Sequence, residues 1–196
     1  MKTIVLALLG AVAAVAQPVG FGVIGGMPLA DAFSASNGFT FHTNSKSYIL
    51  GADLELRLPL GLGLEANALY HPLSSSGTGS GNMESVSGHS FEFPIMAKYR
   101  FPSKIVKPFV EGGVSFGTLS GLTETVASGL GVTNKPATSN NPVGVVLGGG
   151  VDIHALILHI APEIRYTRWD KALFTDPTSV MQGSQNQAEF LVDIVF

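Results

Sequence analysis

Residues 48–71 read YILGADLELRLPLGLGLEANALYH. From Tyr48 to Leu58 every second residue is apolar, and the residues between them include three charged ones, Asp53, Glu55 and Arg57. After Pro59 the apolar residues again hold every second position as far as Tyr70. A period of two residues is that of a β-strand with one apolar and one polar face. The stretch therefore predicts two strands joined by a tight turn at Pro59.

The same alternation recurs along the chain and gives eight segments: 20–28, 48–58, 60–71, 91–101, 108–117, 143–153, 158–168 and 187–196. In each segment we call the positions that alternate with the apolar ones the polar parity. Thirteen of the fourteen charged residues in the segments lie on the polar parity, and the exception, Arg168, lies at a strand end. Segments of about nine to eleven residues suit a tilted strand that crosses a bilayer. We therefore predict an all-β fold, an eight-stranded antiparallel up-and-down transmembrane β-barrel.

Composition agrees with a barrel in lipid. The 196 residues carry a net charge of −3, only 13% are charged, 24 are glycine and none is cysteine, and mean hydropathy is +0.34. No apolar run approaches the ~18 residues of a membrane-spanning helix. The near balance of charge argues against a nucleic-acid partner.

The first residues have the three parts of a secretory signal. Met1-Lys2 precedes the stretch Thr3–Leu9, which is apolar from Ile4 onward, and Ala14-Val15-Ala16 forms an A-x-A cleavage site. We expect a signal peptide over 1–16, with cleavage before Gln17, and a barrel domain over 17–196. The alternative is a short buried helix of the mature domain.

The connections alternate in length. Short links are expected at Pro59, 102–107 and 154–156, and long Gly/Ser/Thr-rich loops at 29–47, 74–89, 118–142 and 169–186. In bacterial outer-membrane barrels the short turns face the periplasm and the long loops face outward. The 74–81 stretch, SSSGTGSG, is expected to be a flexible solvated tip.

Aromatic residues gather near both ends of the segments, as in the two interfacial girdles of membrane barrels. Those expected on the periplasmic side are Phe21, Tyr99, Phe101 and Phe196, and those on the outer side are Tyr48, Tyr70, Phe91, Phe116, Tyr166 and Trp169.

Taken together, these features resemble the small outer-membrane β-barrel family of OmpA/OmpX type. The most specific match is the C-terminal stretch FLVDIVF, in which Phe190, Val192, Ile194 and Phe196 share one parity. In the family such a terminus is the assembly signal read by the barrel-insertion machinery. The resemblance implies location in the bacterial outer membrane, with lipid and lipopolysaccharide around the barrel.

The polar parity supplies the candidate interior. We expect a polar network of nine carboxylates and four cations: Asp53, Glu55, Arg57, Glu65, Glu92, Lys98, Arg100, Glu111, Asp152, Glu163, Arg165, Glu189 and Asp193. An eight-stranded barrel has room only for side chains, so these groups should pair and plug it. The excess of acids means that some carboxyls should be protonated or hydrated. The alternative is a narrow passive channel.

The sequence contains few signs of metal binding or catalysis. His71 and His89 flank one long loop but lack a third ligand, so no metal site and no cofactor are expected. His89 and Ser90 with Glu92, or His42 with Ser45, suggest a lipid-modifying enzyme, yet adjacent strand residues point to opposite faces. We therefore expect no catalytic residues.

Two broader readings remain. The first is a structural or surface-interaction barrel that acts through four extracellular loops, whose sequences identify no ligand. The second is a soluble, lipocalin-like carrier, in which Leu54, Leu64 and Ile95 would line a cavity and the charges would face solvent.

Overall fold

The computed structural model describes residues 19–29, 33–35, 41–42, 48–79, 82–128, 131–136, 141–155, 158–171 and 181–196. Side chains are described over 19–29, 48–72, 88–120, 141–154, 158–171 and 184–196. The signal peptide expected over 1–16 lies outside the described residues, as does most of the first long connection.

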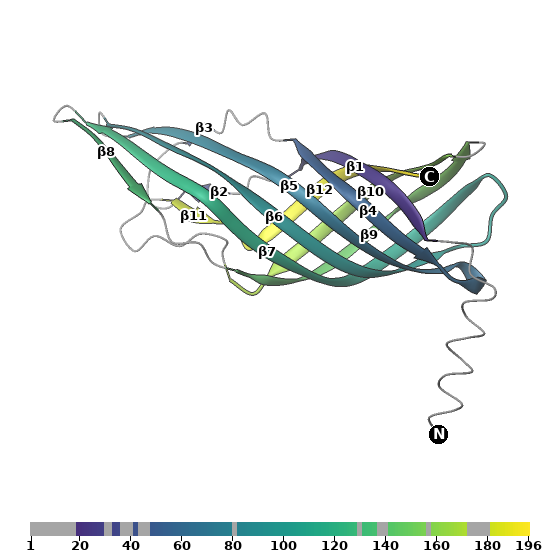
Figure 1. The fold of residues 1–196 in the computed structure, drawn as a ribbon. Helices are drawn as coiled ribbons and strands as arrows, with labels where there is room; N and C mark the ends of the chain where they lie inside the picture. Colours follow the sequence, from purple (N-terminus) through teal and green to yellow (C-terminus); the bar gives the residue numbers. More distant parts are fainter. Residues whose placement is uncertain are drawn as a thin grey trace, which may run out of the picture.

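Eight long strands form one closed sheet. They are β1 (Gly20–Pro28), β4 (Ile49–Arg57), β5 (Leu62–Gly79), β6 (Asn82–Arg100), β7 (Val106–Ser128), β9 (Val143–Ala155), β10 (Leu158–Trp169) and β12 (Asn186–Val195). Each pairs antiparallel with its neighbours in chain order, and β12 closes the sheet on β1 through pairs such as Met27↔Phe190. The predicted eight-stranded up-and-down barrel is therefore confirmed (Figure 1).

The short elements lie at the ends of these strands. They are β2 (Phe33–Ala35), β3 (Phe41–His42), β8 (Gly131–Pro136), β11 (Met181–Gly183) and the 3₁₀ turn η1 (Pro59–Gly61). None of the helical segments in the described part of the chain is long and apolar enough to cross a membrane.

The turn between β4 and β5 is longer than expected. Leu60, expected in a strand, lies in η1 with a φ of 65°, and Gly61 follows with a φ of 80°. A left-handed conformation suits glycine, because it has no Cβ to clash with the following carbonyl. A Cβ on Gly61 would also strike the backbone carbonyl of Arg100.

The apolar parity faces outward. Leu54 is 44% exposed and Ile95 52% exposed, whereas Asp53, Glu55 and Lys98 on the opposite parity are buried. An exposed apolar band around a closed sheet is what a bilayer requires. The soluble-carrier interpretation, which needs Leu54, Leu64 and Ile95 inside, is wrong.

Two expected loops are largely strand. β5 and β6 remain paired as far as Gly79↔Asn82, and β6 and β7 as far as Met83↔Ala127. The loop boundaries 74–89 and 118–142 are therefore wrong, and residues 74–79 lie in β5 and not in a loop tip. Ladder hydrogen bonds come from the backbone, so a Ser/Thr/Gly-rich stretch can extend a hairpin without apolar alternation. A β-bulge between Ser87 and His89 interrupts the register where the extension begins.

We call this extension the tall hairpins, comprising residues 73–79, 82–88, 120–128 and 131–136. It projects at the end of the barrel opposite η1, the 101–105 turn and the start of β1, which together mark the short-turn end (Figure 1). β12 also ends at the short-turn end, where the Phe196 backbone N–H donates to the carbonyl of Phe21.

The interior is not wholly polar. Ile24, Ile49, Leu69 and Leu191 form a buried apolar cluster on the inward parity of β1, β4, β5 and β12. Trp169, expected in the outer aromatic girdle, is 2% exposed and points inward, and its Nε1 donates to Gln187 Oε1 at 3.0 Å. The assignment of Trp169 to the girdle failed because it shares the parity of Arg165 and Thr167.

Candidate functional site: the charged interior

The barrel interior gathers the charged residues of the polar parity. Cross-strand register places them opposite one another or opposite glycine, as in Glu55↔Glu65, Lys98↔Glu111 and Arg165↔Gly148. All thirteen residues expected there have buried or largely buried side chains. Twelve of the thirteen, all but Asp193, form three clusters, which we name by position along the barrel.

The central cluster contains two cations shared among three carboxylates. The Arg165 guanidinium is 0% exposed and contacts Glu163 Oε1 at 2.6 Å, Glu111 Oε1 at 3.2 Å and Glu65 Oε1 at 3.3 Å. Lys98 Nζ contacts Glu65 and lies 3.2 Å from Glu111 Oε2. Two cations that bridge the same carboxylates from different strands tie β5, β6, β7 and β10 together across the lumen.

Asn67 extends the central cluster toward β4. Its Nδ2 donates to Asp53 Oδ1 at 2.6 Å and to Glu65 Oε1 at 3.1 Å, and its Oδ1 accepts from Arg165 Nη1 at 2.9 Å. The amide thus binds two carboxylates and a guanidinium together, because it has both a donor and an acceptor group.

Phe109 and Gly148 shape the same cluster. The Lys98 ammonium lies 4.3 Å from the centre of the Phe109 ring, a cation–π geometry. A Cβ on Gly148 would lie 2.6 Å from Glu111 Oε1, so the absence of a side chain there makes room for the carboxylate.

The upper cluster lies toward the tall hairpins. Glu92 accepts from Ser115 Oγ at 2.7 Å and from Gln187 Nε2 at 2.7 Å, and the same amide donates to Glu189 Oε1 at 2.6 Å. His71 lies between the two carboxylates, 3.5 Å from Glu92 Oε2 and 3.4 Å from Glu189 Oε1.

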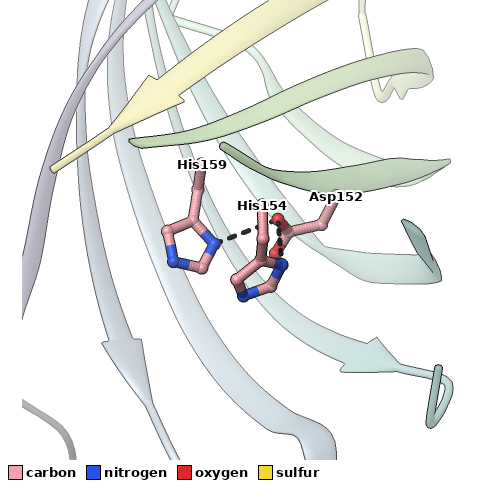
Figure 2. A group of neighbouring side chains, drawn as sticks. All are labelled: Asp152, His154 and His159. Atoms are coloured by element: carbon pink, nitrogen blue, oxygen red, sulfur yellow. Dashed lines mark hydrogen bonds and ion pairs between the residues drawn. The ribbon is translucent and has the colours of Figure 1, made fainter. Parts of the chain in front are cut away.

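The third cluster is a closed ring of side chains at the short-turn end. Arg57 contacts Glu55 at 3.4 Å, Glu55 contacts Arg100 Nη1 at 2.5 Å, and Arg100 Nε donates to Asp152 Oδ2 at 2.8 Å. The ring closes through His159, whose Nδ1 lies 3.0 Å from Asp152 Oδ1 and whose Nε2 lies 3.1 Å from Arg57 Nη1. His154 packs against the His159 ring, with 3.9 Å between centroids (Figure 2).

The amide and histidine members of these clusters were not chosen as site residues from the sequence. Asn67, His71, His159 and Gln187 all stand on the polar parity, which was the available signal. The site residues were predicted from their charge, and amide side chains such as that of Asn67 carry no charge. Asp193 lies in the interior as expected, with its Oδ1 lacking a hydrogen-bond partner among the described residues.

The suggested hydrolase residues do not come together. Ser90 is buried on the inner face, whereas the His89 ring lies beside Tyr70 and Phe91, with centroids 5.9 Å from each. Adjacent strand residues point to opposite faces, so Ser90 cannot use His89 as its base. The side chains of His42 and Ser45 lie outside those described.

The remaining expected positions are on the outer surface. Phe190, Val192 and Ile194 share the outward parity of β12, and Phe196 is exposed just beyond it. Their role as an assembly signal stays a prediction.

Comparison with known families identifies the chain. The model of the outer membrane protein beta-barrel domain matches residues 3–183. The chain belongs to this family. It is an outer-membrane protein, which agrees with its exposed apolar band.

Two solved structures have a similar fold. Neisserial surface protein A is 14% identical with a TM-score of 0.58, and the alignment covers 92% of this chain and 97% of that one. Ail, the attachment invasion locus protein of Yersinia pestis, is 7% identical with a TM-score of 0.51, covering 90% and 96%. At these identities the likeness shows the fold alone. The comparison with curated proteins finds no match.

Proposed function

We propose that this outer-membrane barrel is a plugged scaffold that presents its tall hairpins to the cell exterior, where they contact a surface partner. The observation that carries the proposal is that β5, β6 and β7 continue as paired strands beyond the ends of the other barrel strands. Paired strands hold their tips in a defined place, which an interaction surface needs and membrane anchoring alone does not.

The packing of side chains in the barrel interior supports the first half of the proposal, that the barrel is plugged. In the central cluster Arg165 and Lys98 bridge carboxylates from opposite sides of the lumen, and Ile24, Ile49, Leu69 and Leu191 pack beside them. Eight strands leave room only for such side chains. Trp169 and Gln187 add bulk to the upper cluster.

The names of the similar proteins agree with a surface role. One is called a surface protein, and the other is named for attachment and invasion. Both share the fold at low identity, so the proposal rests on the hairpins. It assigns no catalytic activity to the chain, consistent with the separation of His89 from Ser90.

The proposal includes a route to the membrane. Export uses a signal peptide cleaved after Ala16, insertion uses Phe190, Val192, Ile194 and Phe196 as the signal to the barrel-assembly machinery, and lipid with lipopolysaccharide surrounds the outward band. A mature protein whose mass retains Met1 would contradict the cleavage.

Orientation can be tested with single cysteines, because the chain has none. Thr78→Cys lies in the tall hairpins and Ser103→Cys in the turn at the short-turn end. On intact cells a membrane-impermeant maleimide should label Thr78→Cys and leave Ser103→Cys unlabelled until the cells are opened. The reverse pattern would place the hairpins in the periplasm.

The surface role is tested by shortening one hairpin. Deleting 74–87 and joining β5 to β6 with a two-residue turn leaves the barrel strands intact. Cells that produce the full chain should bind epithelial monolayers or matrix-coated plates more than cells without it, and the shortened variant should lose this gain. Equal binding by both forms at equal surface levels would refute the role.

A further inference from the structure

We propose that Asp152, His154 and His159 form a zinc-binding site at the short-turn end of the barrel (Figure 2). Each residue can offer one ligand atom, and the three atoms lie within 4.8 Å of one another. Two imidazole nitrogens and one carboxylate oxygen form a donor set that suits zinc better than it suits magnesium or calcium. The site is independent of the proposed surface role, and the sequence alone did not suggest it.

The two strands build the set without help from a loop. Asp152 and His154 are two residues apart on β9 and therefore share its inward face. His159 on β10 is the direct register partner of His154. Side chains of paired residues leave the backbone about 5 Å apart, so the strands position the ligands before any ion arrives.

The two distances from Asp152 Oδ1 to the histidine nitrogens fit a tetrahedral ion. Bonds of about 2.0–2.1 Å place tetrahedral ligand atoms roughly 3.3 Å apart. Asp152 Oδ1 lies 3.0 Å from His159 Nδ1 and 3.7 Å from His154 Nδ1, values on either side of this spacing. His154 Nδ1 is buried and has no hydrogen-bond partner among the described residues, so it is free to bind. A water molecule would complete the coordination.

Of the surrounding residues, one favours zinc binding and another disfavours it. Arg100 Nε holds Asp152 Oδ2 at 2.8 Å and leaves Oδ1 toward the histidines. Arg57 Nη1 faces His159 Nε2 at 3.1 Å, and because arginine only donates, Nε2 accepts and Nδ1 holds the proton. Zinc at Nδ1 displaces that proton and makes Nε2 a donor, which then faces the donor of Arg57.

Arg57 must therefore move when zinc binds. Its side chain is 21% exposed, its only contact to Glu55 is at 3.4 Å, and its Nη2 has no partner among the described residues. Without metal, the contact between Arg57 and His159 closes the ring at the short-turn end. When zinc binds, this contact breaks and the ring opens. Arg57, Arg100 and the nearby Lys107 are positive, so this site binds zinc more weakly than a neutral one.

Two other groups of potential ligands are less suitable. His71, Glu92 and Glu189 offer one imidazole, and Asp53, Glu65 and Asp193 offer none and lie buried beside Lys98. The side chains of His154 and His159 are 33% and 19% exposed at the barrel mouth, which gives an ion a way in.

The test is zinc titration of the purified full chain in detergent without a histidine tag. The expected result is one zinc per chain, with affinity reduced more than about tenfold in both His154→Asn and His159→Asn. His89→Asn, a histidine of the outer face, is the matched control and should bind as the parent does. Heat-modifiable migration on gels confirms that each variant is folded.

Cobalt gives a second measurement that needs no variant. One equivalent of Co²⁺ should produce the visible absorption of a tetrahedral site, and zinc should remove it. Arg57→Gln should bind zinc several-fold more tightly, because Gln Oε1 can accept from His159 Nε2–H. The proposal is overturned if the parent binds no stoichiometric zinc, if both histidine variants bind like the parent, or if Arg57→Gln binds no more tightly.

Discussion

Arg165 is a fully buried side chain at the centre of the interior network. Its guanidinium contacts Glu65, Glu111 and Glu163 and also donates to Asn67 Oδ1. Breaking a buried charge network by removing one partner is costly, because the remaining charges stay buried without compensation.

We therefore predict that Arg165→Met lowers the free energy of unfolding by about 3–5 kcal/mol. Urea unfolding in detergent, followed by heat-modifiable migration, measures the change. Arg168→Met is the matched control: Arg168 is exposed at the rim and bonded only to Asn186 among the described residues, so its loss should cost about 0–1 kcal/mol. Equal effects of the two variants would show that the central cluster is not a structural network.

Ile95 tests the outward face. It is 52% exposed near the middle of the part of β6 that lies below the tall hairpins, between the inward Pro94 and Met96. A charge at this depth meets lipid, so Ile95→Arg should destabilise the inserted barrel by about 2–4 kcal/mol, whereas Ile95→Leu should change little. Folding into lipid vesicles across a urea series gives the difference. Similar stabilities would contradict the inside-out assignment of the strands.

At the level of elements, the last strand closes the barrel and carries the proposed assembly signal. β12 turns Leu191 and Val195 inward and Phe190, Val192 and Ile194 outward. Its pairing with β1 is the step that closes the barrel.

Deleting Phe196 should slow insertion and leave unassembled protein in the periplasm, because we propose that Phe196 is part of the signal that directs assembly. Pulse-chase labelling with fractionation measures the rate, and Phe196→Tyr, which keeps an aromatic ring, is the control. If the truncated form assembled at the parent's rate, Phe196 would not be part of the assembly signal.

The sequence predicted the strands that close the barrel because their two faces meet different environments, lipid and lumen. Leu54 and Asp53 differ in polarity for that reason, and alternation then reveals the strand. The tall hairpins meet water on both sides, so stretches such as 74–79 have no alternation to detect. The interior was predictable only for charged groups, since Asn67 and Trp169 share the inward parity without a charge to mark them.

The ring at the short-turn end was harder to predict than the central cluster. Arg57, Asp152 and His159 come from three strands separated by up to about a hundred residues, and their meeting depends on the register of the whole barrel. Parity shows which face a residue takes. It does not show how far along the lumen its side chain meets another.

At the scale of the whole molecule, the barrel is a closed sheet with lipid outside and three layers of bonded side chains inside. The short-turn ring, the central cluster and the upper cluster follow one another along the axis, with an apolar cluster beside them. A water-filled path would have to pass all three. We therefore propose that the barrel is a scaffold and not a pore.

The conductance of the purified chain in a planar lipid bilayer tests this central claim most directly. The bonded layers predict insertion without a steady open current, and Arg165→Met with Lys98→Met, which removes both cations of the central cluster, should admit more current than the parent. A large, steady conductance from the parent chain itself would contradict the account.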